Sequence, residues 1–170
     1  MTAAESAAQP ERRREVSWDD PLATAALAPT MSGLDYVRGM IDGAVPPPPI
    51  ASLMRMRVVA ADTGTTTFEC DPDESHYNPI GTVHGGVACT LLDSAAGCAV
   101  QTTLPQGYGY TSIEIAVKFL RPILQSSGPL TCTATVTKPG RRVAFADVTL
   151  TDAGGTLLAT ASSSLLVFPF

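Results

Sequence analysis

The most distinctive pattern in the chain is a long apolar stretch that follows a turn rich in glycine. From Val87 to Val100 almost every residue is apolar or small, and Asp93 carries the only ionisable carboxyl group. A helix that is apolar on all sides is typical of a buried element. The pattern therefore predicts one long buried helix, from about His84 to Thr102, that bears a single carboxylate.

Short runs of β-branched and aromatic residues, separated by turn residues, predict strands on both sides of this helix. Two strands are expected before it and four after it, at about residues 54–61, 65–70, 110–120, 130–137, 142–151 and 156–168. The short links between the last strands favour antiparallel pairing. We therefore predict an α+β fold in which an antiparallel β-sheet wraps around one long central helix.

The first fifty residues differ from the rest in composition. Residues 1–30 are rich in Ala, Pro and charged side chains, which predicts a flexible N-terminal extension. Ser32 is a candidate N-cap for a short helix from Gly33 to Asp42, and the prolines at 46–49 predict an extended spacer. We therefore divide the chain into an extension (1–30), a short helix with a Pro-rich spacer (31–50) and a folded domain (51–170).

The start of the predicted long helix combines Asn78 and His84 with Gly85 and Gly86. The first N–H groups of a helix have no partner inside it, and the positive end of the helix dipole lies behind them. Such a terminus can polarise a carbonyl or hold an oxyanion. Further along, Asp93 has no Lys or Arg three or four positions away. A carboxylate in this setting needs a structural partner or a chemical task, and the residues alone leave both readings open.

The spacing of the candidate groups leads to a prediction about assembly. Gly85 and Asp93 are eight residues apart, which is about 12 Å along a helix. A reacting carbonyl must lie about 3 Å from both its hydrogen-bond donor and the attacking group. If both residues serve one reaction, Asp93 must therefore come from a second subunit, and the protein is expected to be an obligate dimer with two shared sites.

Five short motifs occur in a characteristic order over about residues 50–168. They are Asn78-Pro79-x-Gly81-x-x-His84-Gly85-Gly86, Leu91-Leu92-Asp93, Thr111-Ser112-Ile113-Glu114, Phe119-Leu120-Arg121-Pro122 and Gly140-Arg141-Arg142. Together they resemble the hotdog-fold acyl-CoA thioesterases, in particular the phenylacetate-pathway (PaaI-like) type of the 4-hydroxybenzoyl-CoA thioesterase superfamily. The resemblance implies a hotdog fold and hydrolysis of an acyl-CoA thioester with a medium-chain or aryl acyl group.

The resemblance also implies roles for individual residues. The Gly85 N–H would polarise the thioester carbonyl, and Asp93 of the partner subunit would act as general base or nucleophile. Asn78 and His84 would line the site. Ser112 would position the attacking water, although a one-residue slip would give that role to Thr111. Gly86 would contribute to substrate binding, and neither a metal nor another cofactor is implied.

Charge adds a candidate binding surface for coenzyme A. The net charge of −5 argues against a nucleic-acid partner. Between Ile115 and Ala146, however, there is no acidic residue, and the basic residues there are Lys118, Arg121, Lys138, Arg141 and Arg142. This local excess of positive charge suits the phosphates of coenzyme A, and guanidinium groups match phosphate geometry.

Other features limit the class of protein. No run of eighteen apolar residues predicts a membrane span, and residues 1–17 lack the apolar core of a signal peptide, so we expect a cytoplasmic protein. The four cysteines are scattered, which argues against a disulfide framework or a zinc site. The expected partners are the acyl-CoA substrate and a second copy of the chain, with two dimers forming a homotetramer.

Two alternatives remain at this stage. Acyl-CoA hydratases and dehydratases share the fold, but His76 stands where their motif has Asp, and Gly81 stands where it has His. A non-catalytic acyl-CoA-binding protein is the other alternative, and Asp93 would then be a structural carboxylate. We expect the wall of the acyl pocket to draw on Leu92, Ala96 and the segment around Leu53.

Overall fold

The computed structural model describes residues 11–170. It contains four α-helices, six strands and three short 3-10 helices in the described residues. The α-helices are α1 (Pro21–Ala25), α2 (Gly33–Asp42), α3 (Pro49–Met54) and α4 (Gly85–Gln101). The strands are β1 (Met56–Asp62), β2 (Thr65–Cys70), β3 (Tyr108–Phe119), β4 (Leu130–Lys138), β5 (Val143–Thr151) and β6 (Leu157–Pro169). The 3-10 helices are Ala28–Thr30, Glu74–His76 and Gln125–Ser127.

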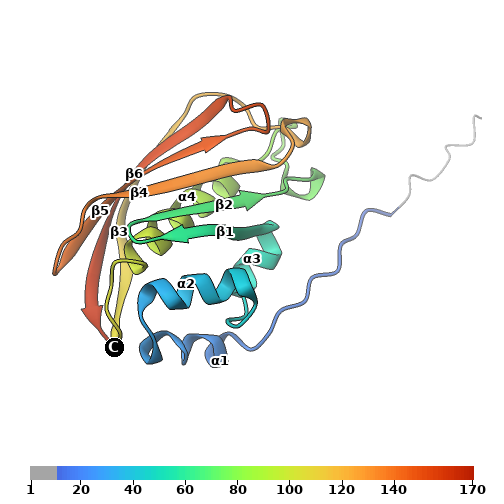
Figure 1. Cartoon of the computed structure of the whole chain (residues 1–170). Coiled ribbons are helices and arrows are strands. Elements are labelled where there is room, and N and C mark those ends of the chain that lie inside the picture. The colour runs from blue at the N-terminus through green and yellow to red at the C-terminus, as the bar shows by residue number, and fades with distance from the viewer. Residues whose placement is uncertain (1–10) are drawn as a thin grey trace, which may run out of the picture.

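The six strands form one antiparallel sheet in the order β1-β2-β4-β5-β6-β3. The sheet curves around α4, and α2 and α3 lie beside β1 (Figure 1). The apolar residues of α4 form the centre of the core, and Leu92, Ala96 and Ala99 are fully buried there. The predicted α+β fold with a sheet around one long helix is therefore confirmed.

Most predicted elements are found within two residues of their expected ends. The long helix begins at Gly85, one residue after its N-cap His84, and α2 has the predicted bounds. The Ser32 side chain accepts a hydrogen bond from the Asp35 N–H, and Gly43 ends α2 with a φ of 79°, which glycine adopts without steric cost.

The N-terminal part differs from the prediction in two places. The proline run does not remain extended to its end, because Pro49 occupies the first turn of α3, where its missing N–H costs nothing. Residues 21–30, expected to be flexible, form α1 and a 3-10 turn. The Asp20 side chain caps α1 by accepting from the Leu22 N–H, and Thr24 and Ala28 are buried. Residues 1–10 of the predicted extension lie outside the described residues.

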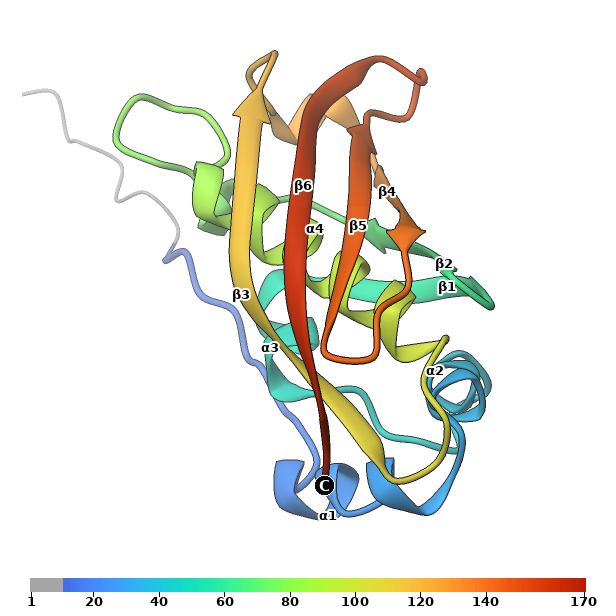
Figure 2. The same cartoon turned by 90° about the vertical axis from the view of Figure 1, so that its left-hand side faces the viewer.

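β3 is an edge strand, and no other described strand pairs with its outer side. Figure 2 shows it at the border of the sheet, next to β6. The pairing with β6 slips between Ser112 and Glu114, which leaves Ile113 as a bulge residue that is 56% exposed. A bulge shifts the alternation of a strand by one position. As a result Ser112, before the bulge, and Ile115, after it, both face α4.

Candidate active site

The start of α4 offers one unpaired backbone donor. His84 Nδ1 accepts a hydrogen bond from the Gly86 N–H at 2.8 Å, and the His84 carbonyl accepts from the Val87 N–H at 2.9 Å. Among residues 11–170 the Gly85 N–H has no acceptor. A ligand carbonyl can therefore bind at Gly85, whereas the predicted role of Gly86 is restricted to shape because its N–H is already engaged.

Both glycines lie close to neighbouring side chains. A Cβ atom on Gly86 would lie 2.9 Å from His84 Nδ1 and would disturb the cap. A Cβ atom on Gly85 would lie 3.2 Å from the ring of Phe119.

The His84 side chain is exposed. Because its Nδ1 accepts the hydrogen bond from Gly86, the neutral ring carries its proton on Nε2.

Asn78 organises the loop that precedes α4. Its Oδ1 accepts from the N–H groups of Ile80 and Thr82, each at 3.1 Å, and its Nδ2 donates to Thr82 Oγ1 at 2.8 Å. Gly81, with a φ of 81°, completes the turn. Because these hydrogen bonds stay within the loop, the Asn78 side chain mainly shapes the wall of the site. Its second Nδ2 hydrogen is left for a ligand.

A cleft of about 390 Å³ lies in front of this helix start. Gly85 and Asn78 form one side of it, and Phe119, Leu120 and Arg121 form the other. We call it the Gly85 cleft. Of the predicted coenzyme A-binding residues, only Arg121 lies here.

Asp93 faces a second cleft, of about 440 Å³, two helical turns further along α4. Ser112 donates a hydrogen bond from its hydroxyl to Asp93 Oδ1 at 2.7 Å, and Cys89 and Thr90 lie beside the pair. Asp93 is half-buried, and no Lys, Arg or His in the described residues forms an ion pair with it. Thr111 is exposed and does not line this Asp93 cleft, so Ser112 is the hydroxyl in contact with Asp93.

The thiols near Asp93 are poor nucleophiles. Burial, with a smaller contribution from the Asp93 charge, raises the pKa of Cys89. Burial also raises the pKa of Cys98 to about 12. Since the thiolate is the reactive form, both cysteines stay protonated at neutral pH. Asp93 and Ser112 are therefore the candidate reactive groups of this cleft.

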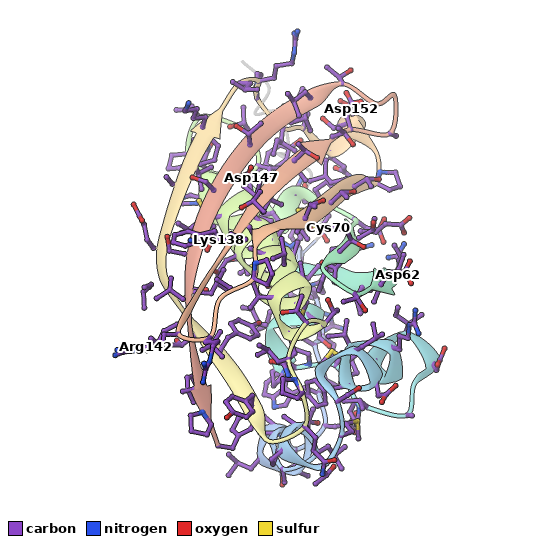
Figure 3. All side chains as sticks on the ribbon, turned by 60° about the vertical axis from the view of Figure 1, so that its left-hand side comes forward. Asp62, Cys70, Lys138, Arg142, Asp147 and Asp152 are labelled. Atoms are coloured by element: carbon purple, nitrogen blue, oxygen red, sulfur yellow. The ribbon has the colours of Figure 1, made fainter. Side chains whose placement is uncertain are left out.

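The remaining basic residues are not brought into these clefts. Lys118, Arg141 and Arg142 line neither the Gly85 cleft nor the Asp93 cleft. Arg142 extends from the turn between β4 and β5 away from the sheet, as Figure 3 shows. Their role in binding phosphates stays a prediction. Within residues 11–170 no cluster of His, Cys, Asp or Glu could hold a metal ion, and no helix is long and apolar enough to cross a membrane.

A third and larger cavity, of about 620 Å³, lies beside α2 and α3. The expected wall residues Leu92 and Ala96 are fully buried in the core and do not line it. Ser94 and Cys98, on the neighbouring face of α4, do. Leu53 itself is exposed, although other residues of α3 form part of the wall.

Comparison with known proteins identifies the family. Residues 80–159 match the Thioesterase superfamily. Acyl-coenzyme A thioesterase 13 of Homo sapiens is 33% identical over 108 residues, which make up 63% of this chain and 76% of that protein. The chain belongs to the thioesterase superfamily. It is therefore a thioester hydrolase, as the motifs predicted.

Solved structures of superfamily members agree with the fold. A putative thioesterase of Ralstonia eutropha, described as a phenylacetic acid degradation-related protein, is 28% identical with a TM-score of 0.71, over 77% of this chain and 98% of that one. The PaaI protein from the phenylacetic acid degradation operon of E. coli is 21% identical with a TM-score of 0.65, over 70% and 83% of the two chains. The predicted hotdog fold and the resemblance to PaaI-like thioesterases are confirmed.

Proposed function

We propose that this thioester hydrolase cleaves an acyl-CoA, with a medium-chain or aryl acyl group, to the free acid and CoA at sites shared by two subunits. The proposal rests on the observation that the two candidate reactive groups of one chain lie in different clefts. The free Gly85 N–H lies in one cleft, the Asp93–Ser112 pair lies in another, and β3 borders both.

Pairing between the free outer edges of β3 in two subunits would bring the two clefts together. Phe119 of β3 lines the Gly85 cleft, and Ile113 lines the Asp93 cleft. If two β3 edges pair antiparallel about a two-fold axis near Ala116, Phe119 lies opposite Ile113 of the partner subunit. Each Gly85 cleft then meets an Asp93 cleft. The exposed apolar side chains of Ile113 and Phe119 would also become buried, which favours association.

The chemistry follows from the groups in such a shared site. The Gly85 N–H, at the positive end of α4, donates to the thioester oxygen and stabilises the charge that develops there. Asp93 of the partner subunit has Oδ1 held by Ser112, and Oδ2 is available to take a proton from water. The water oxygen attacks the carbonyl carbon, and the tetrahedral intermediate collapses with loss of the CoA thiolate.

Direct attack by Asp93 is the second route to the same products. Its carboxylate would attack the carbonyl carbon, the C–S bond would break with loss of the CoA thiolate, and water would hydrolyse the resulting anhydride to the free acid and the Asp93 carboxylate. In either route the Ser112 hydroxyl donates a hydrogen bond to Asp93, and its oxygen can accept a hydrogen bond from the attacking water. Arg121 in the Gly85 cleft would hold a phosphate of coenzyme A, with Lys118, Arg141 and Arg142 as further candidates.

Thiol release from a panel of acyl-CoAs tests the proposal. We expect the wild type to release CoA, and Asp93→Asn to lose at least about 100-fold in kcat because the amide is neither base nor nucleophile. Asp147→Asn, on an exposed position of β5, is the matched control and should keep full activity. Hydrolysis that survives Asp93→Asn would overturn the role of Asp93, and no release from any acyl-CoA would overturn the proposed reaction.

A further inference from the structure

The third cavity is an apolar chamber. It is formed by α2 and α3, which precede the residues that match the superfamily, together with α4 and β3, which lie within the match. Its volume is about 620 Å³, within the range of roughly 300–1,000 Å³ typical of small-molecule sites. Helices α2 and α3 form one wall, β1 and β2 form the floor, and α4 and β3 close the inner side. The side chains that matter below are Tyr36 and Met40 of α2, Ser94, Cys98 and Gln101 of α4, and Tyr110 of β3.

This chamber adjoins the Asp93 cleft along two elements. On α4, Thr90 lines the Asp93 cleft, and Ser94, one turn later on the same face, lines the chamber. On β3, Ser112 contacts Asp93, and Tyr110, the preceding inward-facing residue, lines the chamber. Neighbouring positions of this kind are about 6–7 Å apart. An acyl group whose carbonyl lies at Asp93 is therefore close to the chamber.

Electrostatics agree with this short separation. Burial is the main reason why the pKa values of Tyr110 and Cys98 are raised, and the Asp93 charge contributes to both shifts. From Ser94 the chamber continues along α4 to Gln101, seven residues or about 10 Å further on. A medium-length acyl chain can therefore extend along α4 inside the chamber.

The α2 wall is fixed in place. A Cβ atom on Gly33 would lie 1.8 Å from the Gln101 carbonyl oxygen, so this glycine lets α2 approach the end of α4 closely. The Gly33 N–H donates to the Leu104 carbonyl at 3.0 Å. Arg38 bonds the Ala61 carbonyl at 3.1 Å and pairs with Asp62 at 2.7 Å. A wall held at its start and its middle can limit the length of a bound chain.

We propose that this chamber receives the acyl tail, and that Tyr36 and Met40 of α2 set the longest chain the enzyme accepts. The inference rests on the proposed acyl-CoA hydrolysis. In each shared site the acyl tail lies in the subunit that supplies Asp93, and coenzyme A lies on the subunit that supplies Gly85. Of the acyl groups proposed above, the chamber favours the medium-chain aliphatic class.

Kinetics with saturated acyl-CoAs of increasing length test the chamber. In the wild type, kcat/KM is expected to rise about fourfold for each added methylene that becomes buried, until the chamber is full. Met40→Trp fills the chamber from the half-buried outer side of α2, so it should lower kcat/KM for the longest chains at least about tenfold more than for butyryl-CoA. Ile41→Trp is the matched control, because Ile41 is exposed and does not line the chamber.

A second variant at the same position keeps the test decisive if Met40→Trp does not fold. Met40→Ala enlarges the chamber and should move the optimum to longer chains. If the wild type hydrolyses acyl-CoAs but neither Met40 variant changes the length profile relative to Ile41→Trp, the chamber is not the acyl site. If the wild type hydrolyses no acyl-CoA, the proposed reaction itself fails. A preference for phenylacetyl-CoA over all aliphatic chains would also overturn the proposed substrate class.

Discussion

Removal of the Ser112 hydroxyl is the sharpest single test of the Asp93 cleft. Ser112→Ala deletes the 2.7 Å hydrogen bond to Asp93 Oδ1 and the acceptor for the attacking water. Hydrogen bonds to charged groups contribute about 1.5–3 kcal/mol. If this contribution is realised in the transition state, kcat should fall by about 10- to 150-fold. KM should change little, because Ser112 positions the reacting groups rather than the bulk of the substrate.

Steady-state thiol release with a medium-chain acyl-CoA measures this effect. Thr111→Ala is the matched control, since Thr111 is adjacent but exposed, and it should keep the wild-type kcat. Ser112→Thr retains a hydroxyl on the same strand and should recover most of the activity. Wild-type kcat in Ser112→Ala, or a larger loss in Thr111→Ala, would refute the assignment of the positioning hydroxyl.

Three further outcomes are expected. Gly33→Ala should lower the free energy of unfolding by about 1–3 kcal/mol, seen as a reduced Tm, because its Cβ meets the Gln101 carbonyl at 1.8 Å. Burial opposes ionisation of Asp73, but hydrogen bonds from Ser75 and Arg55 lower its pKa from 3.8 to about 2. A lowered folded-state pKa stabilises above the unfolded value, so about 2 kcal/mol should be lost as the pH falls from about 4 to 2, and this loss should be absent in Asp73→Asn when unfolding is followed by denaturant titration. Cys89→Ser should retain kcat at pH 7 in the thiol-release assay, because burial raises the pKa of the Cys89 thiol and keeps it protonated.

The sequence alone located those helices whose ends are marked by capping residues or glycines. α2 has a Ser N-cap and a glycine at its end, and α4 has a long apolar run after His84 and two glycines, so both were located closely. α3 was missed because its proline start resembles an extended spacer, and only packing of Ala51 against the core favours the helix.

The sequence predicted only part of the candidate site. Local spacing indicated that Gly85 and Asp93 cannot meet within one chain, and they line separate clefts. The bulge at Ile113 has no clear sequence signal, yet it helps determine which residues of β3 face α4. The chamber did leave a signal, since Ser94, Cys98 and Gln101 repeat at helical spacing on an otherwise apolar helix.

A pair of variants isolates the two halves of the shared site. Gly85→Pro removes the N–H that would polarise the carbonyl, and proline is tolerated at the first helical position. The ψ of 134° at His84 also suits a residue before proline. Gly85→Ala adds the same Cβ contact with Phe119 but keeps the N–H, so it controls for crowding. We expect Gly85→Pro and Asp93→Asn each to be inactive as homodimers, and Gly85→Ala to remain active.

The central claim is that each site takes Gly85 from one subunit and Asp93 from the other, and mixing the two inactive variants tests it directly. After the Gly85→Pro and Asp93→Asn proteins are unfolded together in equal amounts and refolded, about half of the dimers contain one chain of each kind. Each mixed dimer has one intact site, so thiol release should return to about a quarter of the wild-type rate. A mixture that forms mixed dimers but is no more active than the two separate variants would contradict the shared site.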